Sequence, residues 1–325
     1  MDAGAARLRW RGLGERLSSV CMCKAWPWLL FGWLVALTAN ACSIDQRSLG
    51  RLVSGDADGG DADGGAEVWV PFGLVTIHPA LANATASQAD PTLTADELEM
   101  YFSSNPNTDW DIWLVQRASI DSAWEPPAKV DELSSDYLDE TPEVSADGLT
   151  MYLASERPGG TDGEHLWVSH RATRADPWDA PVPVAEFVGG DKDLSPSLAH
   201  DELLMAFASL HGTDWDLYAT TRPSPTDMWE APTPITELNS PEFDWDPALY
   251  QDGRSIVFAS RRLNTSNSLF YASRTTVTDE FSVPEPAVEL NVNDDGDPWL
   301  SDDGHHIVFD SRRGGGPIKI YEAWR

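Results

Sequence analysis

Acidic residues recur at two fixed places before five regularly spaced prolines. These prolines stand at positions 91, 142, 196, 247 and 298, at intervals of 51, 54, 51 and 51 residues. Three residues before them are Gln88, Asp139, Asp193, Asp244 and Asp295, and one residue before them are Asp90, Thr141, Ser195, Asp246 and Asp297. Carboxylates held close together shift one another's pKa, can share a cation, and can act as a pair of catalytic acids. The spacing therefore predicts a ring of carboxylates as a candidate ligand-binding face.

A structural role for the same acids is the favoured alternative. Each repeat has a loop after its second strand-like segment, and in repeats two, four and five this loop carries Arg157, Arg262 and Arg313, which could pair with the acids. Repeats one and three carry Asn105 and His211 there instead. If the arginines are structural partners, these two sectors are where a cation or a basic side chain would bind most readily.

Two tryptophans stand in the same two exceptional repeats. Trp110 and Trp215 each lie in a TDWD loop and could stack against a sugar or a peptide, although packing is the favoured interpretation. The tryptophans at 124, 178 and 229 recur at one place in the repeat and are expected to pack between neighbouring units.

The elements that must position these residues follow from the repeat itself. After each proline comes an Asp-Gly or Asp-Glu turn, then an apolar segment ending in serine, such as LTMYLAS, and then a second segment such as HLWVSHR. An aromatic-x-x-Pro element and a third short strand follow in the first four repeats. With the short strand at the proline, each unit contains four antiparallel strands, which is typical of a propeller blade.

The pattern D-x-x-P-x-x-S-x-D-G, followed by an apolar strand and S-x-R, resembles the WD40-like repeats of TolB-type β-propellers. Asp139 to Gly148, with Ser155 and Arg157, is the closest copy, and the resemblance covers about residues 88–325. It implies the fold but no particular function. TolB has an additional α/β domain before its propeller for which there is no room here, so the resemblance does not imply a role in the Tol system.

The number of strands predicts how the propeller closes. Four complete units and a fifth with three strands give nineteen, and the segment 68–83 resembles the end of a repeat, so it could supply the twentieth. We expect an all-β, five-bladed propeller of four-stranded antiparallel blades, its last blade closed by an N-terminal strand, with six blades as the alternative. The repeats are expected near 88–137, 138–189, 190–242, 243–292 and 293–325, the last completed by a strand from 67–87, so that the propeller spans 67–325.

The N-terminal residues predict where in the cell the protein is located. Residues 26–39 form an uncharged apolar run after several arginines, as in a secretory signal, and are short for a membrane span. The sequence before Cys42 resembles the lipobox of bacterial lipoproteins, with Ala39 at the position usually held by leucine. We expect a signal peptide at 1–41, translation from Met1 or Met22, lipidation of Cys42, and a flexible Gly/Asp linker at 42–66. The protein would then be secreted across the inner membrane and held by lipid alone, most readily at the outer membrane, on its periplasmic or surface side.

Charge and cysteine content exclude several functions. The net charge of −31 repels a phosphate backbone, so nucleic acid is not an expected partner. All three cysteines lie at or before residue 42, which leaves no thiol nucleophile or disulfide beyond that point. The sequence contains no G-x-S-x-G, P-loop or H-E-x-x-H motif.

The leading hypothesis is a monomeric, non-enzymatic binding or scaffold module of the cell envelope, with a protein, peptide or glycan as its partner. The alternatives are a carbohydrate-active enzyme that uses channel carboxylates and a cation-dependent lectin. The binding module requires no cofactor. The cation-dependent lectin would bind Ca²⁺. No residue is assigned a catalytic role.

Overall fold

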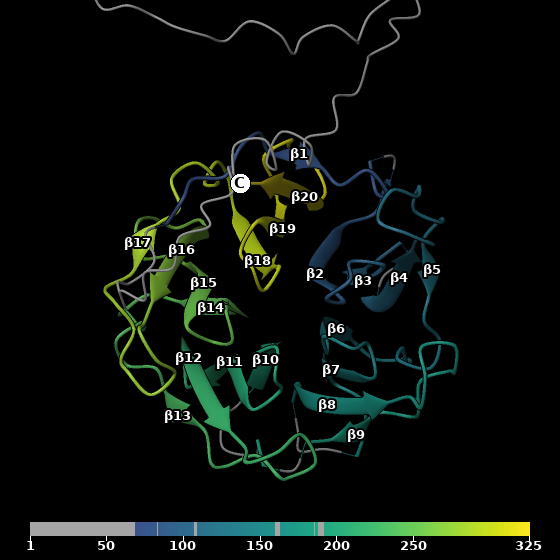
Figure 1. The fold of residues 1–325 in the computed structure, drawn as a ribbon, viewed down its shortest axis with the longest axis horizontal. Coiled ribbons are helices and arrows are strands. Elements are labelled where there is room, and N and C mark those ends of the chain that lie inside the picture. The colour runs from purple at the N-terminus through teal and green to yellow at the C-terminus, as the bar shows by residue number, and fades with distance from the viewer. Residues whose placement is uncertain (1–68, 83, 107–108, 160–162, 185, 188–191) are drawn as a thin grey trace, which may run out of the picture. The chain divides into compact units, whose positions relative to one another are not determined.

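Each sequence repeat folds into one four-stranded antiparallel sheet in the computed structural model, which describes residues 69–325 except 83, 107–108, 160–162, 185 and 188–191. The five sheets are arranged as blades around a central axis, with β2, β6, β10, β14 and β18 innermost (Figure 1). The predicted five-bladed propeller is confirmed, and the six-bladed alternative is wrong. The described residues contain no helix of the length and hydropathy needed to cross a membrane.

The blades are numbered in chain order, and their strands run from the axis outwards. Blade 1 contains β2 (Gln88–Leu93), β3 (Glu99–Ser104), β4 (Asp111–Gln116) and β5 (Ala128–Lys129). Blade 2 contains β6 (Asp139–Val144), β7 (Thr150–Ser155), β8 (His165–His170) and β9 (Val182–Pro183). Blade 3 contains β10 (Lys192–Leu198), β11 (Leu204–His211), β12 (Asp214–Thr221) and β13 (Thr233–Pro234). Blade 4 contains β14 (Asp244–Tyr250), β15 (Ser255–Ser260), β16 (Ser268–Ser273) and β17 (Glu285–Pro286). Blade 5 contains β18 (Asp295–Leu300), β19 (His306–Ser311), β20 (Lys319–Trp324) and β1 (Thr76–Ile77).

The second strand of each blade forms the core. Every residue of β3, β15 and β19 is buried, because both faces of this strand pack against neighbouring blades. Aromatic and β-branched residues suit such a pleated, enclosed position. Tyr101, Phe258 and Phe309 are among the largest side chains that are completely buried.

A bulge interrupts every innermost strand at the repeat proline. The register with the second strand shifts there in all five blades. The residue before each proline has a positive φ between 44° and 54°. This is the left-handed region, which is uncommon for any residue with a side chain. The bulge turns this one side chain away from the alternation of the strand and towards the central axis.

An arginine that follows the third strand of each blade bonds to the turn between the first and second strands, at the end of the blade away from the bulge. Its guanidinium donates to a backbone carbonyl in this turn and stacks on an aromatic ring, as Arg222 does on Trp229 at 4.2 Å. The equivalent arginines are Arg117, Arg171, Arg274 and Arg325. The ring follows the arginine in the chain in blades 1 to 4, and in blade 5 it is that of Trp69, from the N-terminal segment. Trp229 also donates to the Tyr152 hydroxyl of the preceding blade, so the predicted packing of these tryptophans between units is confirmed.

The N-terminal segment completes blade 5. Thr76 pairs with Glu322 and Ile77 with Tyr321, so β1 lies beside β20 (Figure 1). The Gly73 amide donates to the Trp324 carbonyl, and the Arg325 guanidinium donates to the Val70 carbonyl. The predicted closure is therefore confirmed, and both ends of the propeller belong to one sheet.

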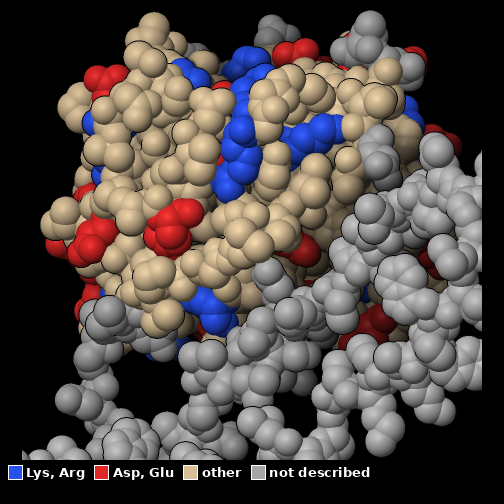
Figure 2. Space-filling view, turned by 90° about the horizontal axis from the view of Figure 1, so that it is seen from above, with Lys and Arg blue, Asp and Glu red and all other residues tan. Residues whose placement is uncertain are grey.

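The outer surface of blade 5 is not uniformly acidic. Figure 2 shows this side with a short band of Lys and Arg side chains between mostly uncharged residues, while Asp and Glu are scattered around it. Acidic and basic side chains are thus unevenly distributed over the described part of this side.

Alanine substitutions at two glycines of similar backbone conformation can measure how tightly neighbouring blades pack. Gly253 has a φ of +74°, and a Cβ there would meet Leu204 at 2.6 Å; Gly212 has a φ of +71° and nothing within 4 Å. Gly212→Ala is expected to cost about 1 kcal/mol of unfolding free energy, from the backbone alone. Gly253→Ala should cost at least about 1 kcal/mol more, because the junction must open. Urea unfolding of both variants measures this difference, and equal losses would contradict tight packing at this junction.

Candidate functional site

The acids three residues before the prolines are occupied by structural ion pairs in three blades. Asp139, Asp244 and Asp295 are fully buried at 0 % exposure. Their carboxylates accept from Arg157 at 2.5 Å, Arg262 at 2.6 Å and Arg313 at 2.7 Å. Each guanidinium also donates to the carbonyl of a leucine in the segment that enters its blade, namely Leu133, Leu238 and Leu290. These arginines therefore tie each blade to its incoming connection.

Blades 1 and 3 lack this ion pair. In blade 3, Asp193 lies 3.1 Å from His165 and accepts from Ser209 at 2.7 Å, and His211 lies 3.3 Å from Ser209. In blade 1, Gln88 replaces the acid and is 3 % exposed. Pro106, and not Asn105, stands two residues after the β3 serine, where Arg157 stands in blade 2. The Asn105 amide donates to the Ser87 carbonyl.

The side chains one residue before the prolines form a separate ring across the channel. The Thr141 amide donates to Asp90 at 3.1 Å, and the Ser195 amide donates to the Thr141 hydroxyl at 3.1 Å. The Ser195 hydroxyl donates to Asp246 at 2.9 Å, and the Asp297 amide donates to Asp246 at 3.3 Å. Asp297 of blade 5 also interacts electrostatically with Asp90 of blade 1. The ring therefore links all five blades.

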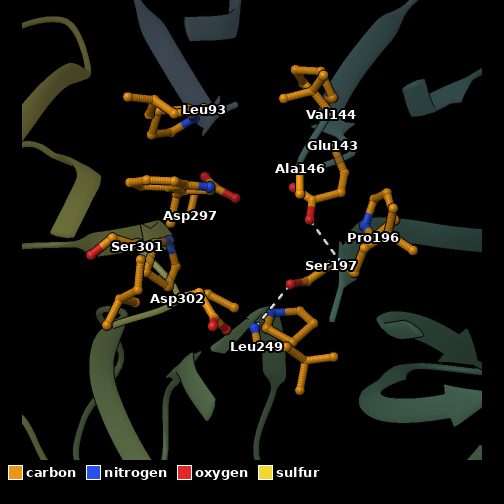
Figure 3. Close-up of a pocket in the computed structure, with 18 of the residues that line it drawn as sticks. Leu93, Glu143, Val144, Ala146, Pro196, Ser197, Leu249, Asp297, Ser301 and Asp302 are labelled. Atoms are coloured by element: carbon orange, nitrogen blue, oxygen red, sulfur yellow. Dashed lines mark hydrogen bonds between the residues drawn. The ribbon is translucent and has the colours of Figure 1, made fainter. Parts of the chain in front are cut away.

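The ring is the inner end of a cavity of about 300 Å³. The cavity extends along the innermost strands to the turns that follow them, where Glu97 and Asp302 line it. In Figure 3, Asp297 and Glu143 reach towards it from opposite sides. Glu143 accepts from the Thr92 hydroxyl at 2.8 Å and from the Leu198 amide at 2.8 Å, and the Ser197 hydroxyl accepts from the Leu249 amide. A volume of this size suits one side chain or one sugar ring.

The lining of this cavity is strongly acidic. Seven acidic residues and His200 contribute to the lining, and no Lys or Arg is among the described residues that line it. The carboxyl groups belong to Asp90, Glu97, Glu143, Asp246, Asp297, Asp302 and Asp303. Glu97, at the outer part of the lining, is paired with Arg117 at 3.4 Å. For the inner carboxyl groups of Asp90, Asp246 and Asp297, no described residue of the lining carries a permanent positive charge.

The innermost carboxyl groups are held towards their neutral forms. Burial raises the pKa of Asp246 to about 6, assisted by the charge of Asp90, and burial raises the pKa of Glu143 to about 7. Burial, together with the charges of Asp246 and Asp90, raises the pKa of Asp297 well above its usual range. Raised pKa values of this kind favour the sharing of a proton between neighbouring carboxyl groups that lack a basic partner.

Asp310 is a member of this cluster that the sequence did not reveal. It is 6 % exposed and occupies a β19 position where blades 2, 3 and 4 have alanine and blade 1 has Ser103. Burial and the charges of Asp90 and Asp246 raise its pKa well above the usual value, although its hydrogen bond with Asp297 opposes this shift. A single acid inside an otherwise apolar strand was the available signal. Glu143 was missed because the repeat offers Thr92, Ser197, Ala248 and Trp299 at its position, with no common chemistry.

The predicted aromatic pair lies outside the cavity lining. Trp215 is half-buried and meets Trp245 edge-on, with ring centroids 6.2 Å apart, while Trp110 is half-buried before β4. His211 lies against Tyr218 at 5.0 Å. The structure therefore does not bring Trp110, Trp215 or His211 together with the carboxyl ring.

No group of three or more His, Cys, Asp or Glu side chains within the described part of the chain is arranged to hold a metal ion. The carboxyl groups of the ring bond to hydroxyls and amides instead. Cys42, the signal segment and the linker lie outside the described residues.

Fold and site together define a five-bladed β-propeller with an acidic central cavity. It is similar to an endo-arabinase from Bacteroides thetaiotaomicron, with 18 % identity, a TM-score of 0.53, and coverage of 74 % of this chain and 94 % of that one. An α-L-arabinofuranosidase from Lactobacillus brevis has 14 % identity, a TM-score of 0.52, and coverage of 75 % and 91 %. TolB from Acinetobacter baumannii has 15 % identity and a TM-score of 0.42, and the match covers 62 % of this chain but 43 % of that one. At these identities the likeness shows the fold alone. No protein-family model matches the sequence, and a comparison with curated proteins finds no match.

Proposed function

We propose that this protein is a binding module whose central cavity receives a basic group, the side chain of a lysine or arginine presented by a protein or peptide. The observation that carries the proposal is the group of Asp90, Asp246 and Asp297 at the inner end of a cavity whose described lining contains no Lys or Arg. An ammonium or guanidinium group entering the cavity would pair with Asp90, Asp246 and Asp297 and displace the protons they share. Trp299 also lines the cavity and offers a ring to a cation.

We further propose that the module works at the cell envelope, tethered by lipid at Cys42 and the linker that follows. The apolar run, the small residues before Cys42 and the Gly/Asp linker support this address. The repeat motif supports kinship with TolB-type propellers. Metabolic labelling with a radioactive fatty acid tests the anchor: label should enter the native chain and be lost in Cys42→Ser.

Binding of two matched peptides tests the cavity. Gly-Gly-Lys-Gly-Gly should bind, and the same peptide with norleucine in place of lysine should not. Asp297→Asn should weaken lysine-peptide binding by about 10- to 100-fold, because charge-assisted hydrogen bonds contribute about 1.5–3 kcal/mol. Calorimetric titration at low salt measures both effects.

Asp201→Asn is the control for this experiment. It removes the same charge from an exposed turn beside the cavity without changing the lining, and its affinity should stay within about twofold of the native value. Equal binding of the two peptides, or no binding of either, would contradict the proposal.

A carbohydrate-active enzyme is the second candidate. The observation in its favour is a pair of cavity carboxyls, Asp246 and Glu143, whose pKa values burial raises to about 6 and about 7, close to those of a general acid at neutral pH. Turnover of a chromogenic α-L-arabinofuranoside that disappears in Asp246→Asn and Glu143→Gln would support this candidate.

A further inference from the structure

The seam that closes blade 5 has a histidine and a glutamate at two positions where the other blades have neither residue. In each blade, one residue after the outer strand donates its amide to a carbonyl of the third strand. That residue is His78 in blade 5, and it is Val130, Val184, Ile235 and Ala287 in blades 1 to 4. Glu322 of β20 likewise replaces Leu114, Val168, Ala219 and Tyr271 of the other third strands. The one blade made from both ends of the chain thus has titratable groups at its join.

A buried imidazole lies at the centre of these groups. His306 begins β19, is 2 % exposed, and stacks on Trp324 with ring centroids 3.6 Å apart. Its Nδ1 lies 3.3 Å from Glu97 of blade 1, and its Nε2 lies 3.6 Å from Glu322. The Nε2 atom of His78, which is 1 % exposed, lies 3.7 Å from the same Glu322 oxygen. His306 therefore contacts blade 1 directly, at Glu97. It is linked to the residue after β1, His78, by Glu322 of β20, which lies near both imidazoles.

Two carboxylates from different blades face the His306 ring. They belong to Glu97, in the turn between β2 and β3, and to Glu322, in β20. Arg117, at the end of β4, pairs with Glu97 at 3.4 Å, and His78 follows β1. A positive charge on His306 would be attracted by both carboxylates in this largely buried place.

We propose that His306 is the centre of a pH-dependent clasp, which holds β1 and blade 1 against β20 when its imidazole is protonated and loosens the join when it is neutral. Burial alone lowers the pKa of His306, but the carboxylates of Glu322 and Glu97, 3.6 Å and 3.3 Å from its ring nitrogens, outweigh it, and the net shift is upward. A raised folded-state pKa means that the stabilisation is fully present below the unfolded value of about 6.5. It is lost as the pH rises through the folded-state pKa.

Hydrogen exchange of single amides tests the clasp in the whole protein. The Gly73 and His78 amides, bonded to Trp324 and Ile320, report on the join. Between pH 6 and pH 9, after correction for intrinsic exchange, their protection should fall by about tenfold for each unit by which the pKa of His306 is raised. The Val184 and Ile235 amides make the matching hydrogen bonds in blades 2 and 3 and serve as internal controls whose protection should not change.

Two variants at neighbouring positions sharpen the test. His306→Gln should give low protection of Gly73 at every pH, whereas His305→Gln changes an exposed histidine and should behave as the native protein does. If His306→Gln does not fold, Glu322→Gln removes one carboxylate instead and should flatten the pH dependence. Equal pH dependence of the Gly73 and Val184 amides in the native protein would overturn the proposal.

Discussion

Replacing Asp246 with asparagine is expected to stabilise the propeller by about 3 kcal/mol at pH 8 and to have little effect at pH 4. Asp246 titrates near pH 6 in the folded protein because burial raises its pKa, whereas an unfolded aspartate titrates near 3.9. The folded state therefore binds the proton more tightly, and stability is lost as the pH rises from about 4 through about 6. Asparagine keeps an oxygen to accept the Ser195 hydroxyl and carries no charge to bury.

Urea unfolding of the native protein and the variant at both pH values measures this effect. Asp136→Asn, in an exposed loop, is the control and should change stability by less than about 0.5 kcal/mol at either pH. If Asp246→Asn were less stable than the native protein at pH 8, the carboxyl ring would need its charge, and the account of shared protons would be wrong.

The second large effect is expected at the structural ion pairs. Asp139→Ala should lower the unfolding free energy by about 3–5 kcal/mol, because it leaves the guanidinium of Arg157 without its carboxylate in a buried place. It also removes the acceptor for the Ser135 amide and for the Ser155 hydroxyl. The midpoint of urea unfolding at pH 7 gives the loss.

The neighbouring Asp136→Ala is the matched comparison, since it removes an exposed carboxylate three residues away. It should cost less than about 0.5 kcal/mol. A loss at Asp139 as small as this would show that the inner arginines do not fasten the blades.

The sequence carries enough signal for the fold because five copies of one pattern reinforce one another. The turn aspartates illustrate this: Asp96, Asp147, Asp201 and Asp303 each accept from an amide two residues later, as a turn residue should. The N-terminal strand β1 was predictable because the last repeat contains only three strands, one fewer than a blade needs. None of these inferences required knowledge of where any side chain points.

The candidate site was only half predictable, for a physical reason. Regular alternation places residues three and one before the proline on the same face of a strand, which suggests a single ring containing Asp139, Asp244, Asp246 and Asp297. The bulge breaks this alternation: Asp139 and Asp244 turn to their arginines, while Asp246 and Asp297 turn to the channel. A positive φ at a residue other than glycine leaves little trace in a sequence, so the separation appears only in the structure.

The central claim is that the cavity carboxyl groups hold shared protons until a basic group replaces them. Carbon-13 NMR of the side-chain carboxyl groups, titrated with and without Gly-Gly-Lys-Gly-Gly, tests it most directly. The titration midpoints of Asp246 and Asp297 should lie above the usual range in the free protein and fall when the lysine peptide binds, while that of Asp201 stays fixed. Midpoints for Asp246 and Asp297 that do not move in the presence of the peptide would contradict the claim.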